Sequence, residues 1–146
     1  MRYFFQKKFI ETVKNLLKKN SYKDCEKALV KDLFDVYSKE FLTNCSANRL
    51  NPNAKNPIVK LRIAYNKGKS ASYRLYFFAI IKEEKLYLGH LYPKTGAKGQ
   101  EVLSKKEENE VIKSLLSDVK SGTTKEVYLD ITKNKICYSF NNDEVW

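Results

Sequence analysis

Three runs of β-branched, aromatic and aliphatic residues, separated by two short polar turns, lie between Ile58 and Lys94. The first turn is Asn66–Ser70, in which Gly68 tolerates a positive φ, and the second is Lys82–Lys85. Runs of this composition form strands, and turns this short join antiparallel neighbours. The stretch therefore predicts a three-stranded antiparallel meander, which needs other parts of the chain to cover its apolar face.

Alternation along the three runs separates two faces, because successive strand residues point to opposite sides of a sheet. Basic, aromatic and imidazole side chains share one face: Lys60, Arg62, Arg74, Tyr76, His90, Tyr92 and Lys94. Aliphatic and phenyl side chains share the other: Val59, Leu61, Ile63, Leu75, Phe77 and Leu91. The alternation also puts apolar residues on the basic side, namely Phe78, Ile80, Leu86 and Leu88. We therefore expect part of the basic face to be covered.

The segment before the meander predicts a strand and two helices. Arg2–Phe5 is strand-like, and residues 7–19 and 22–43 carry apolar residues at helical spacing. We expect these helices to form an antiparallel hairpin over the apolar face of the sheet. Residues 44–57 are rich in Asn, Ser, Ala and Pro, which predicts a loop.

A third helix is predicted after the meander. Ser104 and Glu107 match a capping box, and Gly122 follows the last apolar residue at helical spacing. Beyond it, residues 127–131 and 136–140 alternate and predict a β-hairpin at the edge of the sheet. We expect residues 141–146 to be frayed, although Trp146 is large enough to dock.

These elements together predict an α+β fold. It consists of a small, mostly antiparallel sheet of about four to six strands, an N-terminal helical hairpin on one face, a third helix after the meander and a C-terminal β-hairpin extension. At 146 residues the chain is expected to form a single domain over 1–146, with a core of about 1–121 and the hairpin at about 123–140.

Charge, cysteine content and hydropathy narrow the cellular context. The formal net charge of +11 favours a polyanionic partner such as nucleic acid, an anionic membrane surface or an acidic protein, and charge alone does not choose among them. The three cysteines are scattered and there is a single histidine, so neither a zinc site nor a disulfide framework is predicted. Because no apolar run reaches membrane-spanning length, we expect a soluble cytoplasmic protein with reduced thiols and no cofactor.

Short motifs add a family resemblance. The segment Lys67–Leu75 has the pattern K-G-K-S-x-x-Y-R-L, and Leu86–Lys94 has L-Y-L-x-x-L-Y-P-K. Leu103-Ser104 followed by Glu107-Glu108 then starts the third helix. In this order and spacing the motifs resemble the RelE/HigB family of the RelE/ParE toxin–antitoxin superfamily. The layout matches over roughly residues 1–120. Ala71-Ser72 stands where the family typically has Gly-Gly, and the tail is longer than the family's compact form.

The resemblance implies an endoribonuclease that cleaves messenger RNA without metal, often on the ribosome, and that a cognate antitoxin protein holds inactive. In that chemistry the 2′-hydroxyl attacks the adjacent phosphate, assisted by a base, by cations and by an acid. Candidate catalytic residues are Arg74 and Lys94 for the phosphorane, Lys67 and Lys69 for phosphate binding or as a base, and His90 and Tyr92 for proton transfer or stacking. Candidate RNA-binding residues are Lys60, Arg62, Tyr76 and Lys98.

Two other functions share this sequence pattern. One is a ParE-like inhibitor of DNA gyrase without nuclease activity, and the other is a non-catalytic, basic RNA-binding module of the same fold. Each candidate residue also has a structural alternative. Arg74 can pair with a carboxylate on the third helix, and His90 can be a core histidine. Tyr76 and Tyr92 can be packing residues, and Lys67 and Lys69 can be solubilising residues of a hairpin turn.

Overall fold

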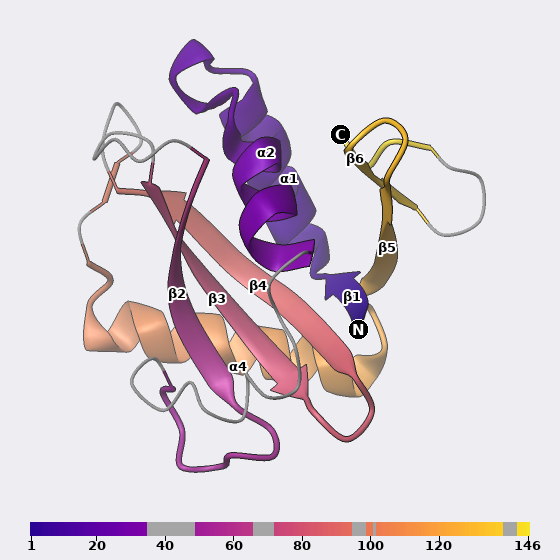
Figure 1. Ribbon diagram of the computed structural model, residues 1–146. Helices are drawn as coiled ribbons and strands as arrows, with labels where there is room; N and C mark the ends of the chain where they lie inside the picture. The colour runs from indigo at the N-terminus through magenta and orange to yellow at the C-terminus, as the bar shows by residue number, and fades with distance from the viewer. Residues whose placement is uncertain (35–48, 66–71, 95–98, 101, 139–142) are drawn as a thin grey trace.

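The computed structural model describes residues 1–34, 49–65, 72–94, 99–100, 102–138 and 143–146 (Figure 1). This part of the chain has an α+β fold around one open, six-stranded sheet with the strand order β2-β3-β4-β1-β5-β6. The strands are β1 (Arg2–Phe5), β2 (Ile58–Ala64), β3 (Ser72–Ile80), β4 (Lys85–Pro93), β5 (Lys125–Asp130) and β6 (Lys135–Tyr138).

Helices cover both faces of the sheet. The described helical elements are α1 (Lys7–Leu17), the 3₁₀ turn η1 (Asn20–Tyr22), α2 (Cys25–Leu29), the π-helical turn η2 (Val30–Phe34) and α4 (Lys105–Ser121). Helices α1 and α2 lie on one side of the sheet and α4 on the other (Figure 1). Of the predicted second helix, 22–43, only the part up to 34 is described. The predicted antiparallel hairpin is therefore not confirmed.

The sheet is mixed, which corrects the mostly antiparallel arrangement that we expected. Strands β2, β3 and β4 form the predicted antiparallel meander, but β1 lies beside β4 and runs parallel to it. This register aligns Phe5 with Leu88, and both side chains are fully buried in the main core. Burial of an apolar face specifies the register of a strand strongly. The other edge of β1 pairs with β5, so the C-terminal hairpin continues the sheet as predicted.

A β-bulge in β4 changes which residues face the helices. Tyr76 pairs with His90 but Phe77 pairs with Leu88, which leaves Gly89 as the extra residue. Because of this shift, Leu86, Leu88 and Leu91 all lie in the core beneath α1 and α2. The predicted position of Leu86 and Leu88 on the basic side is therefore wrong, since strict alternation does not survive an inserted residue.

Helix α4 packs directly onto this bulge. A Cβ atom added to Gly89 would lie 2.8 Å from Cδ2 of Leu115, which is itself buried. The predicted ends of α4 are confirmed. The Ser104 hydroxyl accepts a hydrogen bond from the Glu107 amide at 3.1 Å, and Glu107 Oε1 accepts one from the Ser104 amide at 3.2 Å. Gly122 ends the helix in the left-handed region with φ of 69°.

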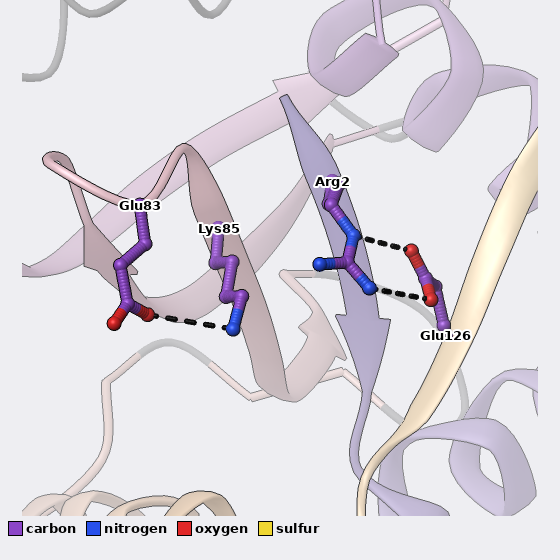
Figure 2. Close-up of polar contacts among 4 residues, drawn as sticks. All are labelled: Arg2, Glu83, Lys85 and Glu126. Carbon is purple, nitrogen blue, oxygen red and sulfur yellow. Dashed lines mark hydrogen bonds and ion pairs between the residues drawn. The ribbon is translucent and has the colours of Figure 1, made fainter.

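Residues 143–146 dock on the core, which corrects the frayed end that we expected there and agrees with the expectation that Trp146 can dock. The Val145 amide donates a hydrogen bond to the Ile136 carbonyl at 3.1 Å, and the Trp146 ring stacks on Phe5 at 5.7 Å between centroids. On the other side of β1, the Arg2 guanidinium forms two hydrogen bonds with the Glu126 carboxylate, at 2.7 and 3.0 Å (Figure 2). These contacts join the N-terminal strand to the C-terminal hairpin.

Two further expectations concerned the cysteines and membrane-spanning segments. Cys25 and Cys137 are free thiols and buried, and burial raises the pKa of Cys25, whereas Cys45 lies outside the described residues. None of the helices in the described part of the chain combines the length and apolar character needed to cross a membrane.

We predict that Gly89→Ala lowers the free energy of unfolding by about 1–3 kcal/mol, because overpacking of a close-packed core costs roughly this much. Leu115→Ala alone should cost about 2–5 kcal/mol by leaving a cavity. In the double variant the alanine at position 115 makes room for the added methyl group. The loss of unfolding free energy in the double variant should therefore be clearly smaller than the sum of the losses in the two single variants. Chemical denaturation of the four proteins measures this coupling, and additivity within about 0.5 kcal/mol would contradict the contact.

Candidate functional site

The register of the meander arranges six of the candidate residues in two adjacent rows. In the first row Arg62 lies beside Arg74, which lies beside Tyr92. In the second row the same three strands contribute Lys60, Tyr76 and His90. Directly opposed residues on neighbouring strands have Cβ atoms about 4.5–5.5 Å apart, so each row forms a continuous line of side chains. The shared face predicted from alternation is therefore present for these six positions.

The first row brings two guanidinium groups together. Arg62 is exposed and Arg74 is half-buried. Among the described residues, no carboxylate lies within ion-pair distance of either side chain, so Arg74 does not pair with α4. Like charges on directly opposed strand positions destabilise a sheet unless an anion compensates them. This end of the sheet is consequently suited to bind a phosphate group, which arginine contacts through two parallel hydrogen bonds.

The second row is tied to α4 through one carboxylate. The buried Tyr76 hydroxyl donates a hydrogen bond to Glu108 Oε2 at 2.8 Å. Lys60 Nζ lies 3.9 Å from the same oxygen and 5.7 Å from the centre of the Tyr76 ring. Burial, and then the hydrogen bond to Glu108, raise the pKa of Tyr76. Tyr76 has no exposed surface on which a base could stack, in agreement with its structural alternative as a packing residue.

Tyr92 links the two rows from a largely buried position. It is 5% exposed and packs with Tyr76 and Leu103 in a small cluster beneath α4. Its hydroxyl is buried, and within the described residues no group forms a hydrogen bond to it in good geometry. Burial raises the pKa of Tyr92, while the nearby charge of Arg74 acts in the opposite direction. A tyrosine in this state is a neutral group beside the arginine row.

His90 is half-buried and lines two pockets. One, of about 240 Å³, lies between β4 and α4. The other, of about 270 Å³, lies between α1 and the end of β4. The His90 ring is 6.1 Å from that of Tyr76 and 5.7 Å from that of Tyr92. Gln100 also lines both pockets.

The surroundings of His90 favour its neutral form. Burial lowers the pKa of His90 first, and the Lys8 ammonium of α1 lowers it further, while the Glu107 carboxylate of α4 opposes them. A neutral imidazole at neutral pH is able to accept a proton. His90 is thus the described residue best suited to act as a general base beside the arginine row.

The remaining candidates are lysines at this end of the meander. The Lys94 amide donates a hydrogen bond to the Ser72 carbonyl at 3.1 Å, which extends the β3–β4 pairing just beyond Pro93. Alternation from Tyr92 places Lys94 on the side of the arginine row, and its side chain is half-buried. Lys67, Lys69 and Lys98 lie outside the described residues.

Several residues of the site were not among the candidates. Glu107 and Glu108 lie in the first turn of α4. The sequence could have indicated them, because they form an acidic pair shortly after Leu103-Ser104. Lys8 gave no signal, because its role depends on where α1 packs. Gln100 gave no signal either; its amide donates a hydrogen bond to the Pro93 carbonyl at 2.9 Å, and the residue lines both pockets.

Comparison with known proteins does not assign this site. A scan against protein-family models, a search of the curated proteins and a search of the solved structures each gave no match. Within the described ranges, no group of three or more His, Cys, Asp or Glu side chains is placed to hold a metal ion. The function of the site therefore has to be inferred from the chain's own residues and from the motif resemblance.

We predict that the pKa of His90 is below its ordinary value and responds to its two charged neighbours in opposite directions. Lys8→Gln removes a cation and should raise this pKa, whereas Glu107→Gln removes an anion and should lower it further. The glutamine at position 107 retains the capping box. Because His90 is the single histidine of the chain, NMR titration of its imidazole protons reports the value directly. A pKa unmoved by either change would contradict the described surroundings.

Proposed function

We propose that this protein is a RelE/HigB-like endoribonuclease and acts as the toxin of a type II toxin–antitoxin pair. The observation that carries the proposal is the arginine row, in which Arg62 and Arg74 lie side by side next to Tyr92, with the neutral His90 in the neighbouring row. Two cations that have no carboxylate partner among the described residues, next to a proton acceptor, match the needs of RNA cleavage at a phosphodiester. The net charge of +11 agrees with a polyanionic substrate.

The proposed reaction is an internal transesterification. His90 takes the proton of the ribose 2′-hydroxyl, and the 2′ oxygen forms a new bond to the adjacent phosphorus. The bond from phosphorus to the 5′ oxygen breaks, and that oxygen leaves as a hydroxyl after accepting a proton. The products are a 2′,3′-cyclic phosphate and a 5′-hydroxyl end, so no oxidant or reductant is needed.

The cations have distinct roles in this proposal. Arg74 contacts two non-bridging oxygens of the phosphorane, whose added charge its guanidinium stabilises. Lys94 stabilises the same charge and helps to protonate the leaving oxygen. Arg62 and Lys60 hold the flanking RNA backbone, and Tyr92 supports the arginine row from beneath α4.

The proposed biological setting follows from the same resemblance. Messenger RNA, cleaved on the ribosome, is the substrate, so that the activity inhibits translation in the cytoplasm. A cognate antitoxin would bind the basic face with an acidic or amphipathic segment and exclude RNA. The single RelE-like domain would then comprise residues 1–146, with a core of about 1–121 and with β5 and β6 as an extension.

We expect the separate variants Arg74→Ala and Lys94→Ala each to lower the RNA cleavage rate by about 10²–10³-fold, the usual cost of removing one group that stabilises transition-state charge. Arg74→Lys should recover only part of the loss, because lysine lacks the bidentate geometry. Lys113→Gln, on the exposed side of α4, is the matched control and should cleave normally. The measurement is mapping of RNA 5′ ends after induction of the protein alone, together with a purified cleavage assay.

The same experiment separates the alternatives. A folded wild-type protein that leaves transcripts intact and growth unchanged would overturn the nuclease proposal. Intact transcripts with induction of a DNA-damage reporter would identify a gyrase inhibitor instead. RNA binding with steep salt dependence and no cleavage, with or without ribosomes, would identify a non-catalytic RNA-binding module.

The pH dependence of cleavage tests the role of His90. The rate should fall as the pH drops through the lowered pKa of His90, because only the neutral imidazole accepts the 2′-hydroxyl proton. Lys8→Gln should move this acid limb to higher pH, in step with the pKa measured by NMR. An acid limb that stays in place while the imidazole pKa moves would exclude His90 as the base.

A further inference from the structure

A second basic pocket lies away from the arginine row, between α1 and the C-terminal hairpin. Its volume is about 530 Å³. It is lined by residues from α1, from the segment that follows α1 and from the C-terminal part of the chain. These residues are Lys14, Leu17, Lys18, Lys23, Glu26, Lys135 and Trp146. We call this site the lysine pocket. Nothing in the resemblance or in the proposed reaction accounts for it.

The lysine pocket and the candidate site lie on opposite sides of α1. Thr12, Asn15 and Leu16 line the pocket that contains His90. Lys14 and Lys18, which line the lysine pocket, project from the other side, because successive residues of an α-helix are about 100° apart. An α-helix with its side chains is about 10–12 Å thick, so a strand of RNA that bends around α1 can reach both sites.

The charges of the lysine pocket are not balanced internally. The one acidic side chain that lines it, Glu26, accepts hydrogen bonds from Lys135 Nζ at 2.9 Å and from the Ile136 amide at 3.1 Å. No acidic side chain in the described part of the chain lies within ion-pair distance of Lys14, Lys18 or Lys23. Lysines scattered on a surface are ordinarily just solvated. Here they converge on a concavity, where the summed potential attracts an anion.

The floor of the lysine pocket suits a nucleobase more than a simple ion. The Trp146 ring stacks on Phe5 at 5.7 Å between centroids, and Trp146 lines the pocket together with Leu17. The hydrogen bond of Val145 to β6 fixes this end of the chain, so the indole is already in place. Aromatic side chains next to cations are the usual means of binding single-stranded nucleic acid.

We propose that the lysine pocket is a second RNA-binding site. It binds a backbone phosphate through Lys14, Lys18 and Lys23, and the neighbouring base contacts Trp146 and Leu17. The choice of RNA as ligand rests on the proposed function, whereas the pocket itself rests on the geometry described above. Its effect is to hold the RNA beyond the cleavage point and to increase affinity without entering the reaction.

Trp146 provides a direct test, because it is the single tryptophan of the chain. A short 2′-O-methyl oligoribonucleotide, which has no free 2′-hydroxyl and is not cleaved, is titrated into the full-length protein. We expect a saturable change in tryptophan fluorescence. The double variant Lys14→Gln/Lys18→Gln should bind at least about 10-fold more weakly, and the slope of log K against log salt should shrink by about 0.7 for each phosphate that the variant no longer neutralises.

A charge-matched control separates the pocket from the general positive charge. Lys113→Gln/Lys120→Gln removes the same charge from the exposed surface of α4 and should change affinity and slope much less. Equal losses of affinity in the two double variants would overturn the proposal, as would RNA binding that leaves Trp146 fluorescence unchanged. Circular dichroism of each variant checks that the fold is kept.

The outcome is independent of the nuclease activity. If the wild type does not cleave RNA but Trp146 responds and the Lys14/Lys18 variant binds more weakly, the lysine pocket stands and the nuclease proposal fails. If the wild type cleaves RNA and Trp146 does not respond, the lysine pocket fails alone. Arg74→Ala should keep the fluorescence response, because Arg74 lies on β3 and does not line the lysine pocket.

Discussion

The contact between Gly89 and α4 is the constraint on which the rest of the structure depends. Strand β4 lies in the middle of the sheet and is covered on both faces, by α1 on one side and α4 on the other. The bulge at Gly89 lets the leucines before and after that residue face α1, while leaving a site without a side chain where Leu115 fits. Glycine is the residue that allows this close approach.

The bulge also determines which side chains lie together on the face of the sheet that α4 covers. Because the register shifts there, His90 and Tyr92 lie beside Tyr76 and Arg74 and point to the side of α4. The start of α4 then brings Glu108 to the second row, where one carboxylate satisfies Tyr76 and Lys60. The first row receives no carboxylate from the described part of α4. One helix thus neutralises half of the basic face and leaves the arginine half without a carboxylate partner among the described residues.

Helix α1 connects the remaining features. Its buried side packs against β4, its Lys8 lowers the pKa of His90, and its opposite sides line the His90 pocket and the lysine pocket. The C-terminal hairpin adds Lys135 and Trp146 to this surface only because β5 pairs with β1. The extension of the fold is therefore part of the proposed RNA-binding surface and does more than cover a sheet edge.

Local patterns in the sequence predicted the elements whose causes are local. The meander follows from its turns and its strand-forming runs, and the ends of α4 follow from a capping box and a C-cap glycine, each complete within a few residues. Alternation also predicted that Arg74, Tyr92 and the other described candidates share a face, since alternation holds within each uninterrupted strand. These predictions needed no knowledge of what packs against what.

Tertiary structure decided everything that depends on contacts between distant segments. The bulge at Gly89 is stabilised by Leu115 of a helix that begins after the meander has ended. Other features also depend on residues far apart in the chain. These are the parallel pairing of β1 with β4, the hydrogen bond from Tyr76 to Glu108 and the lowering of the His90 pKa by Lys8. A sequence pattern records the period of an element but not its neighbours. The basic face was therefore predictable from the sequence, whereas its division into one row that a carboxylate neutralises and one row that no described carboxylate reaches was not.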